Sequence, residues 1–191
     1  QINFTDSESR IMPVSGGGFE QAYNAQASVD METMLIVGNH VSQQTNDKQE
    51  VEPALTQLDK LPESLGKVEK AALDSGFFSE HNTNCFETKE IEPYIASGRH
   101  SHNLSLEERL TPPPSPPINP DAVKAMEYRL KTEAGKQFYG KRKSTVEPVF
   151  GIIKEVMGFR RFMLRGFETV TGEWTLVCIA FNLKRLCRLS V

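Results

Sequence analysis

Long apolar runs and a cysteine framework are both missing from this chain of 191 residues. No apolar stretch approaches the roughly 18 residues that a transmembrane helix needs, so we expect no membrane span and no membrane partner. The three cysteines, Cys85, Cys178 and Cys187, are scattered and form no C-x-x-C pair. His100 and His102 are close together, but they stand in a polar stretch where we expect them to be solvated. We therefore expect neither a disulfide framework nor a zinc site, and we expect a reducing, cytoplasmic setting.

The start of the chain lacks an initiator methionine and a signal-peptide pattern. Residue 1 is Gln, and no sequence of charged, apolar and small-residue regions follows it. We interpret the sequence as a fragment or an incomplete reading frame. Its length corresponds to one domain or a little more, and 38% hydrophobic and 25% charged residues are ordinary for a globular protein.

The net charge of -3 hides an excess of basic residues at the C-terminal end. From Lys136 onward there are 11 Lys and Arg against 4 Asp and Glu, which leaves 11 against 21 in residues 1–135. Lys and Arg supply most non-specific affinity for DNA by neutralising phosphates, so this end is a candidate nucleic-acid interface. A solvated basic helix packed on an acidic sheet explains the charge equally well, and charge alone does not decide between the two.

Periodicity predicts an α/β domain with strands first and helices last. Residues 1–18 are polar and contain a Gly16–Gly18 tract, so we expect an irregular segment there. Residues 23–29 alternate in polarity and residues 34–37 are continuously apolar, which predicts a hairpin. The other expected elements are a helix beginning at 46–49, a strand over 68–73, a helix over 80–88 capped by Ser79, a strand over 92–96, a helix over 120–136, a helix around Glu147 and a last helix over 172–189.

Proline marks the main break in this pattern. The proline-dense run 111–117 cannot form a regular helix or an inner strand, so we expect an extended, polyproline-like linker. We therefore divide the chain into four segments. They are an irregular N-terminal segment (1–18), a strand-rich part (19–98), a Pro-rich linker or insertion (99–120) and a helical C-terminal part (121–191).

Asp74 stands where a functional carboxylate is often found. It follows the predicted strand 68–73 and precedes Gly76, which places it at the carboxyl end of a strand. Ligand sites of open α/β sheets lie at that edge. The structural alternative is that Asp74 only forms the turn.

Glu147 lies inside a basic stretch. Lys143 comes four residues before it and Lys154 seven after it, so in one continuous helix the three side chains share a face. Pro148 favours a position in a first helical turn, which would leave Lys143 outside the helix. The structural alternative for Glu147 is an acid that stabilises the start of a helix.

The motifs around these two acids resemble those of DDE-type insertion-sequence transposases. The run Leu73–Ser79 resembles the second-Asp motif of that family, and Tyr139–Lys154 resembles its Tyr-Arg-Glu-Lys signature, with the required spacing between the Glu and the Lys. Arg142 lies one residue too far from Glu147, so either Lys143 takes the Arg role or the register shifts locally. The resemblance spans about residues 3–188 of the sequence.

The resemblance implies an RNase H-like fold, with a mixed sheet flanked by helices, and a DNA transposase that cleaves phosphodiester bonds and transfers strands at the ends of a transposable element. It implies two Mg²⁺ or Mn²⁺ ions, with Asp74 and Glu147 as catalytic and metal-binding carboxylates. The implied partners are element ends and target DNA, with a homodimer on DNA as an option, in a cytoplasmic, nucleoid-associated location. The implied DNA-binding residues are Tyr139, Lys141, Arg142, Lys143, Lys154, Arg160 and Arg161.

The family's first Asp, on a first strand in an Asp-Gly-Thr-like context, has no counterpart in this sequence. Asp6, in a polar loop, and Asp30, in a hairpin turn, are the only nearby acids that could be proposed for it. The simpler interpretation is an N-terminally truncated domain that holds two of three carboxylates, and we then expect this chain to be inactive by itself. A non-catalytic DNA-binding or assembly remnant is the alternative, and an unrelated nuclease of the same fold is a third hypothesis.

Overall fold

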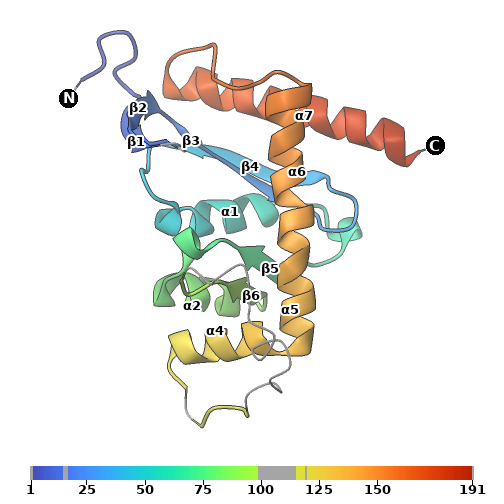
Figure 1. Cartoon of the computed structure of the whole chain (residues 1–191). Coiled ribbons are helices and arrows are strands. Elements are labelled where there is room, and N and C mark those ends of the chain that lie inside the picture. Colours follow the sequence, from blue (N-terminus) through green and yellow to red (C-terminus); the bar gives the residue numbers. More distant parts are fainter. Residues whose placement is uncertain (1, 15–16, 99–114, 119, 191) are drawn as a thin grey trace. The chain divides into compact units, whose positions relative to one another are not determined.

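A computed structural model describes residues 2–14, 17–98, 115–118 and 120–190 (Figure 1). The chain forms two compact units, which we call unit 1 (residues 1–65 and 143–191) and unit 2 (residues 66–142). Most of the Pro-rich segment 99–120 lies outside the described residues. The division into four segments therefore stays a prediction.

Unit 1 contains two antiparallel hairpins. β1 (Arg10–Pro13) pairs with β2 (Phe19–Ala22), and β3 (Asn24–Val29) pairs with β4 (Ile36–Ser42). The second hairpin confirms the prediction from alternating polarity. The expectation of an irregular segment up to residue 18 was wrong for β1. A strand of four residues with one buried side chain, Met12, carries too short a pattern to be detected in the sequence.

The first helix of unit 1 begins where the sequence predicts it. The Asn46 side chain accepts a hydrogen bond from the Lys48 amide at 3.1 Å and starts the 3-10 turn η1 (Asp47–Gln49). α1 (Val51–Leu58) follows directly. The other helical elements of unit 1 are η2 (Glu63–Leu65), α6 (Val146–Gly151), the π-helical turn η5 (Ile152–Val156) and α7 (Phe167–Leu189).

The core of unit 1 lies between the β3–β4 hairpin and the C-terminal helices. Trp174 of α7 is 2% exposed, and its indole Nε1 donates to the Gln26 carbonyl of β3 at 2.9 Å. The Asn182 side chain accepts from the Ile36 amide and donates to the Ile36 carbonyl, each at 2.8 Å, which binds α7 to the start of β4. The buried members of this core are Ile36, Val41, Val149, Ile153, Val170, Trp174, Cys178 and Phe181.

Unit 2 is built on a β-α-β unit. β5 (Lys70–Leu73) and β6 (Glu92–Ile95) run parallel, and α2 (Glu80–Thr88) forms part of the crossover that a parallel pair requires. The Ser79 hydroxyl accepts from the Asn82 amide at 3.1 Å, so the predicted helix cap is confirmed. The carboxyl ends of β5 and β6 lie at the same edge of this small sheet.

Two helices replace the single helix that was predicted over 120–136. α4 (Ala122–Lys131) ends at Thr132, whose backbone is extended, and α5 (Glu133–Gly140) begins after it. The Thr132 hydroxyl accepts from the Gly135 amide at 3.0 Å and so caps the second helix. The 3-10 turns η3 (Ser75–Phe77) and η4 (Lys141–Ser144) complete the described elements, and η4 crosses the boundary between the units.

The described strands form three separate two-stranded sheets, two antiparallel and one parallel. The α/β class is therefore confirmed. The single mixed sheet of an RNase H-like fold is not seen among the described residues, and that arrangement stays a hypothesis.

Candidate functional site

Asp74 lies at the carboxyl end of β5, as the sequence predicts. It caps the turn η3, and its Oδ1 accepts from the Ser75 amide at 2.7 Å. The side chain is 61% exposed, so its carboxylate is accessible to an ion or to a substrate. The β5–β6 edge thus presents a carboxylate to solvent.

Arg142 reaches this carboxylate from the end of the helical segment of unit 2. Its Nη1 lies 3.6 Å from Asp74 Oδ2, and its side chain is only 16% exposed. The guanidinium carbon also lies 5.7 Å from the centre of the Tyr139 ring, which is within the range of a cation–π contact. We call Asp74, Tyr139 and Arg142 the Asp74 cluster.

The pKa of Tyr139 is raised, mainly by burial. Burial raises the pKa of the Tyr139 hydroxyl, and the charge of Asp74 adds to this rise. The charge of Arg142 and the Ala96 backbone act in the opposite direction, but the net pKa lies above the ordinary value of 10.0. At neutral pH the Tyr139 hydroxyl is therefore a hydrogen-bond donor at this edge.

Glu147 lies in unit 1, in the first turn of α6, and is exposed. Pro148 follows it at the third helical position, where a missing amide hydrogen costs no intrahelical bond. Lys143 belongs to η4 and is separated from α6 by Thr145, which confirms the alternative in which Pro148 leaves Lys143 outside the helix of Glu147. The proline sets the start of α6 too late to include Lys143.

The segment after α6 differs from a uniform α-helix. The Met157 amide donates to the Ile152 carbonyl five residues earlier, at 2.9 Å, which closes the π-helical turn η5. Lys154 is an exposed residue of this turn, while Ile153 is 1% exposed in the core. Such turns occur often at functional sites, and they change the angular spacing that a 3.6-residue period assumes.

The remaining predicted DNA-binding residues are exposed cations in and after these turns. Lys141 and Lys143 are exposed in η4. Arg160 and Arg161 are exposed after η5, and Arg160 forms an ion pair with Glu155. Exposure makes these side chains accessible to phosphate groups and equally to water.

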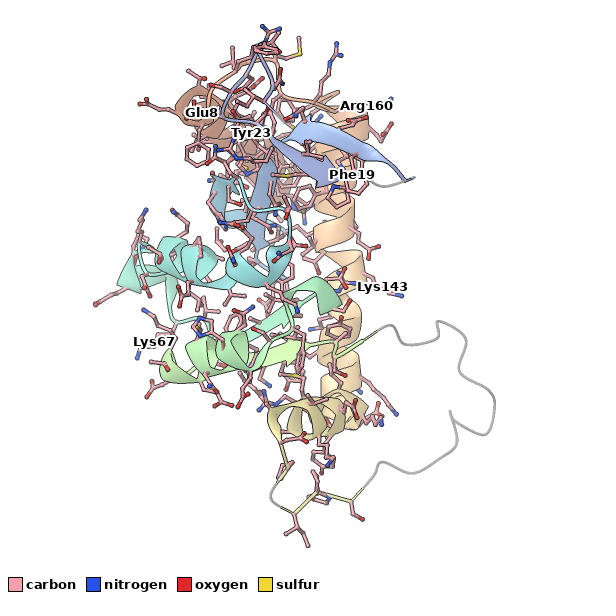
Figure 2. All side chains as sticks on the ribbon, turned by 90° about the vertical axis from the view of Figure 1, so that its left-hand side faces the viewer. Glu8, Phe19, Tyr23, Lys67, Lys143 and Arg160 are labelled. Atoms are coloured by element: carbon pink, nitrogen blue, oxygen red, sulfur yellow. The ribbon has the colours of Figure 1, made fainter. Side chains whose placement is uncertain are left out.

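Asp6 has a structural role in unit 1. Its carboxylate accepts from the Tyr23 hydroxyl at 2.8 and 2.9 Å and from the Gly166 amide at 3.2 Å. Burial opposes its ionisation, but these hydrogen bonds outweigh that effect and lower the pKa of Asp6 below 3.8. Glu8 lies at the same end of unit 1 as Tyr23 (Figure 2) and accepts from the Phe167 amide at 3.0 Å. The two acids thereby satisfy the N-terminus of α7.

Asp30 stabilises the β3–β4 turn. Its Oδ2 accepts from the Thr33 amide at 2.7 Å and from the Thr33 hydroxyl at 2.6 Å. These hydrogen bonds lower the pKa of Asp30 although burial acts in the opposite direction. Neither Asp6 nor Asp30 thus resembles an exposed carboxylate held ready for an ion.

Asp74 and Glu147 each offer carboxylate oxygens, the type of ligand that a hard divalent cation takes. Mg²⁺ binds oxygen ligands, usually one or two carboxylates together with water and phosphate. Both side chains are exposed carboxylates at the ends of regular elements, where backbone geometry orients them. Asp74 belongs to unit 2 and Glu147 to unit 1, so each is described within its own unit.

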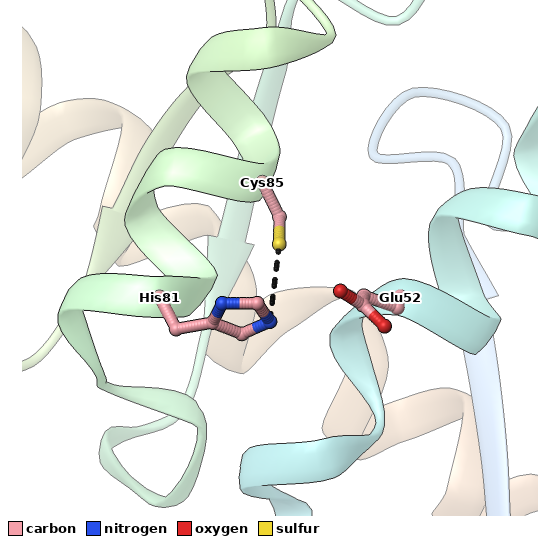
Figure 3. Close-up of side chains that lie close together, drawn as sticks. All are labelled: Glu52, His81 and Cys85. Carbon is pink, nitrogen blue, oxygen red and sulfur yellow. Dashed lines mark hydrogen bonds between the residues drawn. The ribbon is translucent and has the colours of Figure 1, made fainter.

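A histidine and a cysteine of α2 form a contact that the sequence pattern did not lead us to expect. His81 Nε2 and Cys85 Sγ lie 3.6 Å apart (Figure 3). The signal in the sequence was their spacing of four residues within the predicted helix 80–88, because residues at i and i+4 are neighbours on a helix surface. A C-x-x-C pattern has a different spacing and does not reveal such a pair.

Comparison with known proteins agrees with the resemblance seen in the sequence. Residues 116–187 match the family model described as the transposase DDE domain. The resemblance to DDE-type transposases is thereby confirmed for a part of the catalytic domain. The matched region holds Tyr139, Arg142 and Glu147, whereas Asp74 lies outside it.

The family match implies a DNA partner and a dependence on divalent metal ions. Searches of the curated proteins and of the solved structures each found no match. Within the described ranges, none of the helices combines the length and the apolar character that crossing a membrane requires.

Proposed function

We propose that this chain acts in DNA transposition, cleaving phosphodiester bonds at element ends and joining them to target DNA. The contact between Arg142 and Asp74 carries the proposal. Arg142 lies in the region that matches the transposase DDE domain, and Asp74 lies outside it, yet their side chains approach to 3.6 Å. Two motifs that resemble parts of one catalytic site thus meet within unit 2. The proposal includes an RNase H-like arrangement of the strands.

The proposed metal ligands are the carboxylates of Asp74 and Glu147. Two Mg²⁺ or Mn²⁺ ions, when bound, would supply an activated water and neutralise charge on the attacking and leaving oxygens. Both side chains are exposed to the solvent from which the ions would come. Carboxylate oxygens also favour these hard ions over softer metals.

Arg142, rather than Lys143, takes the Arg role of the signature in this proposal. Arg142 contacts both Asp74 and Tyr139, whereas Lys143 is an exposed residue of unit 1. The guanidinium would orient the Asp74 carboxylate, and the protonated Tyr139 hydroxyl would donate to a phosphate oxygen. The exposed cations would neutralise phosphates along the DNA. They are Lys141, Lys143, Lys154, Arg160 and Arg161.

The proposed DNA partners are element ends and target DNA, bound by two copies of the chain on the nucleoid. The test is a nicking assay at low salt with Mg²⁺, Mn²⁺ or a chelator, run beside a salt-titrated DNA-binding assay. In a form of the protein that supplies all three carboxylates, we expect Asp74→Asn and Glu147→Gln to lose metal-dependent nicking by at least about 100-fold, because each removes a charged ligand while keeping the side-chain shape.

Two matched control variants remove a carboxylate in the same local setting. Asp121→Asn changes another exposed cap of unit 2, whose Oδ1 accepts from the Lys124 amide at 2.7 Å. Glu168→Gln changes another exposed first-turn acid of unit 1. Both controls should retain nicking. Retained nicking by Asp74→Asn or Glu147→Gln would refute the assignment of these ligands.

Nicking, measured beside DNA binding, separates the proposal from its alternative. Affinity should fall steeply with salt, since each neutralised phosphate releases counterions. Salt-dependent binding without nicking by the unaltered chain would identify a non-catalytic DNA-binding protein. The absence of both binding and nicking would refute both functions.

A further inference from the structure

The solvent side of α2 carries two metal-ligating side chains in contact. His81 is exposed and Cys85 is partly exposed, and their Nε2 and Sγ atoms are 3.6 Å apart (Figure 3). Glu52, also labelled in that figure, belongs to unit 1, whereas His81 and Cys85 both belong to α2 of unit 2. The two ligand atoms thus lie side by side on one face of α2.

The other side of α2 holds the helix firmly in unit 2. Phe86 is 4% exposed and Thr83 is 5% exposed. The Asn82 side chain is 1% exposed and donates to the Phe77 carbonyl at 2.7 Å. The Ser79 hydroxyl caps the first turn by accepting from the Asn82 amide. The helix therefore presents His81 and Cys85 from a rigid support.

The distance between the two ligand atoms matches the requirement of a tetrahedral metal ion. Zn–S and Zn–N bonds of about 2.3 and 2.0–2.1 Å at a tetrahedral angle place sulfur and nitrogen about 3.6 Å apart. The observed separation of His81 Nε2 and Cys85 Sγ is 3.6 Å. Binding would therefore need deprotonation of the thiol and little movement of either side chain.

We propose that His81 and Cys85 form a binding site for a borderline or soft divalent cation, with Zn²⁺ as the principal ligand. Thiolate and imidazole select such ions, whereas Mg²⁺ and Mn²⁺ prefer carboxylate oxygens. This site is therefore chemically distinct from the proposed Asp74 and Glu147 ligands. Water or another donor fills the remaining coordination positions. The inference stands independently of the proposed function.

Cobalt absorption spectroscopy of the full chain tests this site without any activity assay. Co²⁺ takes the coordination of Zn²⁺, and a thiolate ligand produces an intense charge-transfer band in the near ultraviolet. We expect this band in the unaltered chain, its removal by Zn²⁺ and its persistence in excess Mg²⁺. Because the thiol must lose a proton, the apparent affinity should rise with pH.

Variants assign the band to its ligands. Cys85→Ser should abolish it, and His81→Gln should weaken Co²⁺ binding by at least about tenfold. Cys187→Ser is the control, because it removes an exposed cysteine from a different helix, α7, and should leave the band unchanged. Circular dichroism of each variant excludes unfolding as the cause of a lost band.

Four outcomes overturn the proposal. The absence of a charge-transfer band in the unaltered chain would show that the pair forms only a hydrogen bond. A band that persists in Cys85→Ser, or that disappears in Cys187→Ser, would place the thiolate elsewhere. Equal affinity in His81→Gln and the unaltered chain would remove the histidine from the site.

Discussion

Replacing Gly135 with alanine should destabilise unit 2, although the same change usually stabilises a helix. Gly135 is buried at the third position of α5, just after Thr132 turns the chain from α4 into α5. A Cβ atom there would lie 1.9 Å from the Arg129 carbonyl oxygen, 2.9 Å from the Thr132 hydroxyl and 3.0 Å from the Arg129 carbonyl carbon. The closest of these atoms belongs to the backbone and cannot rotate away.

The magnitude follows from two opposing effects. Alanine is favoured over glycine in a helix interior by about 0.5–1 kcal/mol. An overpacked site costs about 1–3 kcal/mol, and a contact that is about 1.5 Å shorter than a normal one belongs at the upper end. The clash therefore prevails, and we expect a net loss of about 2 kcal/mol, or roughly a 30-fold change in the folded-to-unfolded ratio.

Hydrogen exchange of the full chain measures this loss within each unit separately. Amides of α4 and α5 should exchange up to roughly 30-fold faster in Gly135→Ala than in the unaltered chain. Gly172→Ala is the matched control, because Gly172 lies inside α7 and a Cβ there meets no atom within 4 Å. That control should slow exchange in α7 by a few-fold. If the α5 amides of Gly135→Ala exchanged no faster than those of the unaltered chain, the steric argument would be refuted.

Two further predictions concern unit 1. The pKa of Asp6 is lowered below 3.8 in the folded chain. The ionised Asp6 side chain therefore stabilises the fold fully at pH values above its pKa in the unfolded chain, and this stabilisation is lost as the pH falls through its pKa in the folded chain. In Asp6→Asn the thermal midpoint should therefore decrease less steeply below about pH 4 than in the unaltered chain. Glu20→Gln, which changes an exposed acid, is the control, and an equally steep decrease in both variants would contradict this prediction. Trp174→Phe should cost about 1–3 kcal/mol in urea unfolding followed by circular dichroism, because the Gln26 carbonyl loses its indole donor. An unchanged midpoint would exclude that hydrogen bond as a stabilising one.

The sequence predicted the start of those helices that are capped by a residue only a few positions away. Ser79 caps α2 through an amide three residues away, and Asn46 caps η1 through an amide two residues away. Pro148 predicted that Glu147 begins a helix, since a residue without an amide hydrogen suits only the first turn. These interactions are short in sequence, so the residue pattern alone contains them.

Other local features were missed because their signals are weak or shared with a different structure. Thr132 ends α4 and caps α5, but threonine also occurs inside helices, so the pattern predicted one continuous helix. The π-helical turn η5 begins directly after Gly151, but a glycine inside a helical pattern does not by itself indicate a π-helical turn. β1 gains its pairing from β2, which begins only after the Gly16–Gly18 tract.

For the candidate site, too, some features follow from local sequence and others depend on tertiary contacts. The sequence by itself determined which residue types stand in the resembling motifs, and it placed Asp74 after a strand and Glu147 at the start of a helix, because helix and strand signals act over a few residues. Only the tertiary structure decided that Arg142 contacts Asp74 and that Asp6 accepts from Gly166, 160 residues away. Such contacts depend on how distant elements pack together, and neither charge nor periodicity specifies that packing.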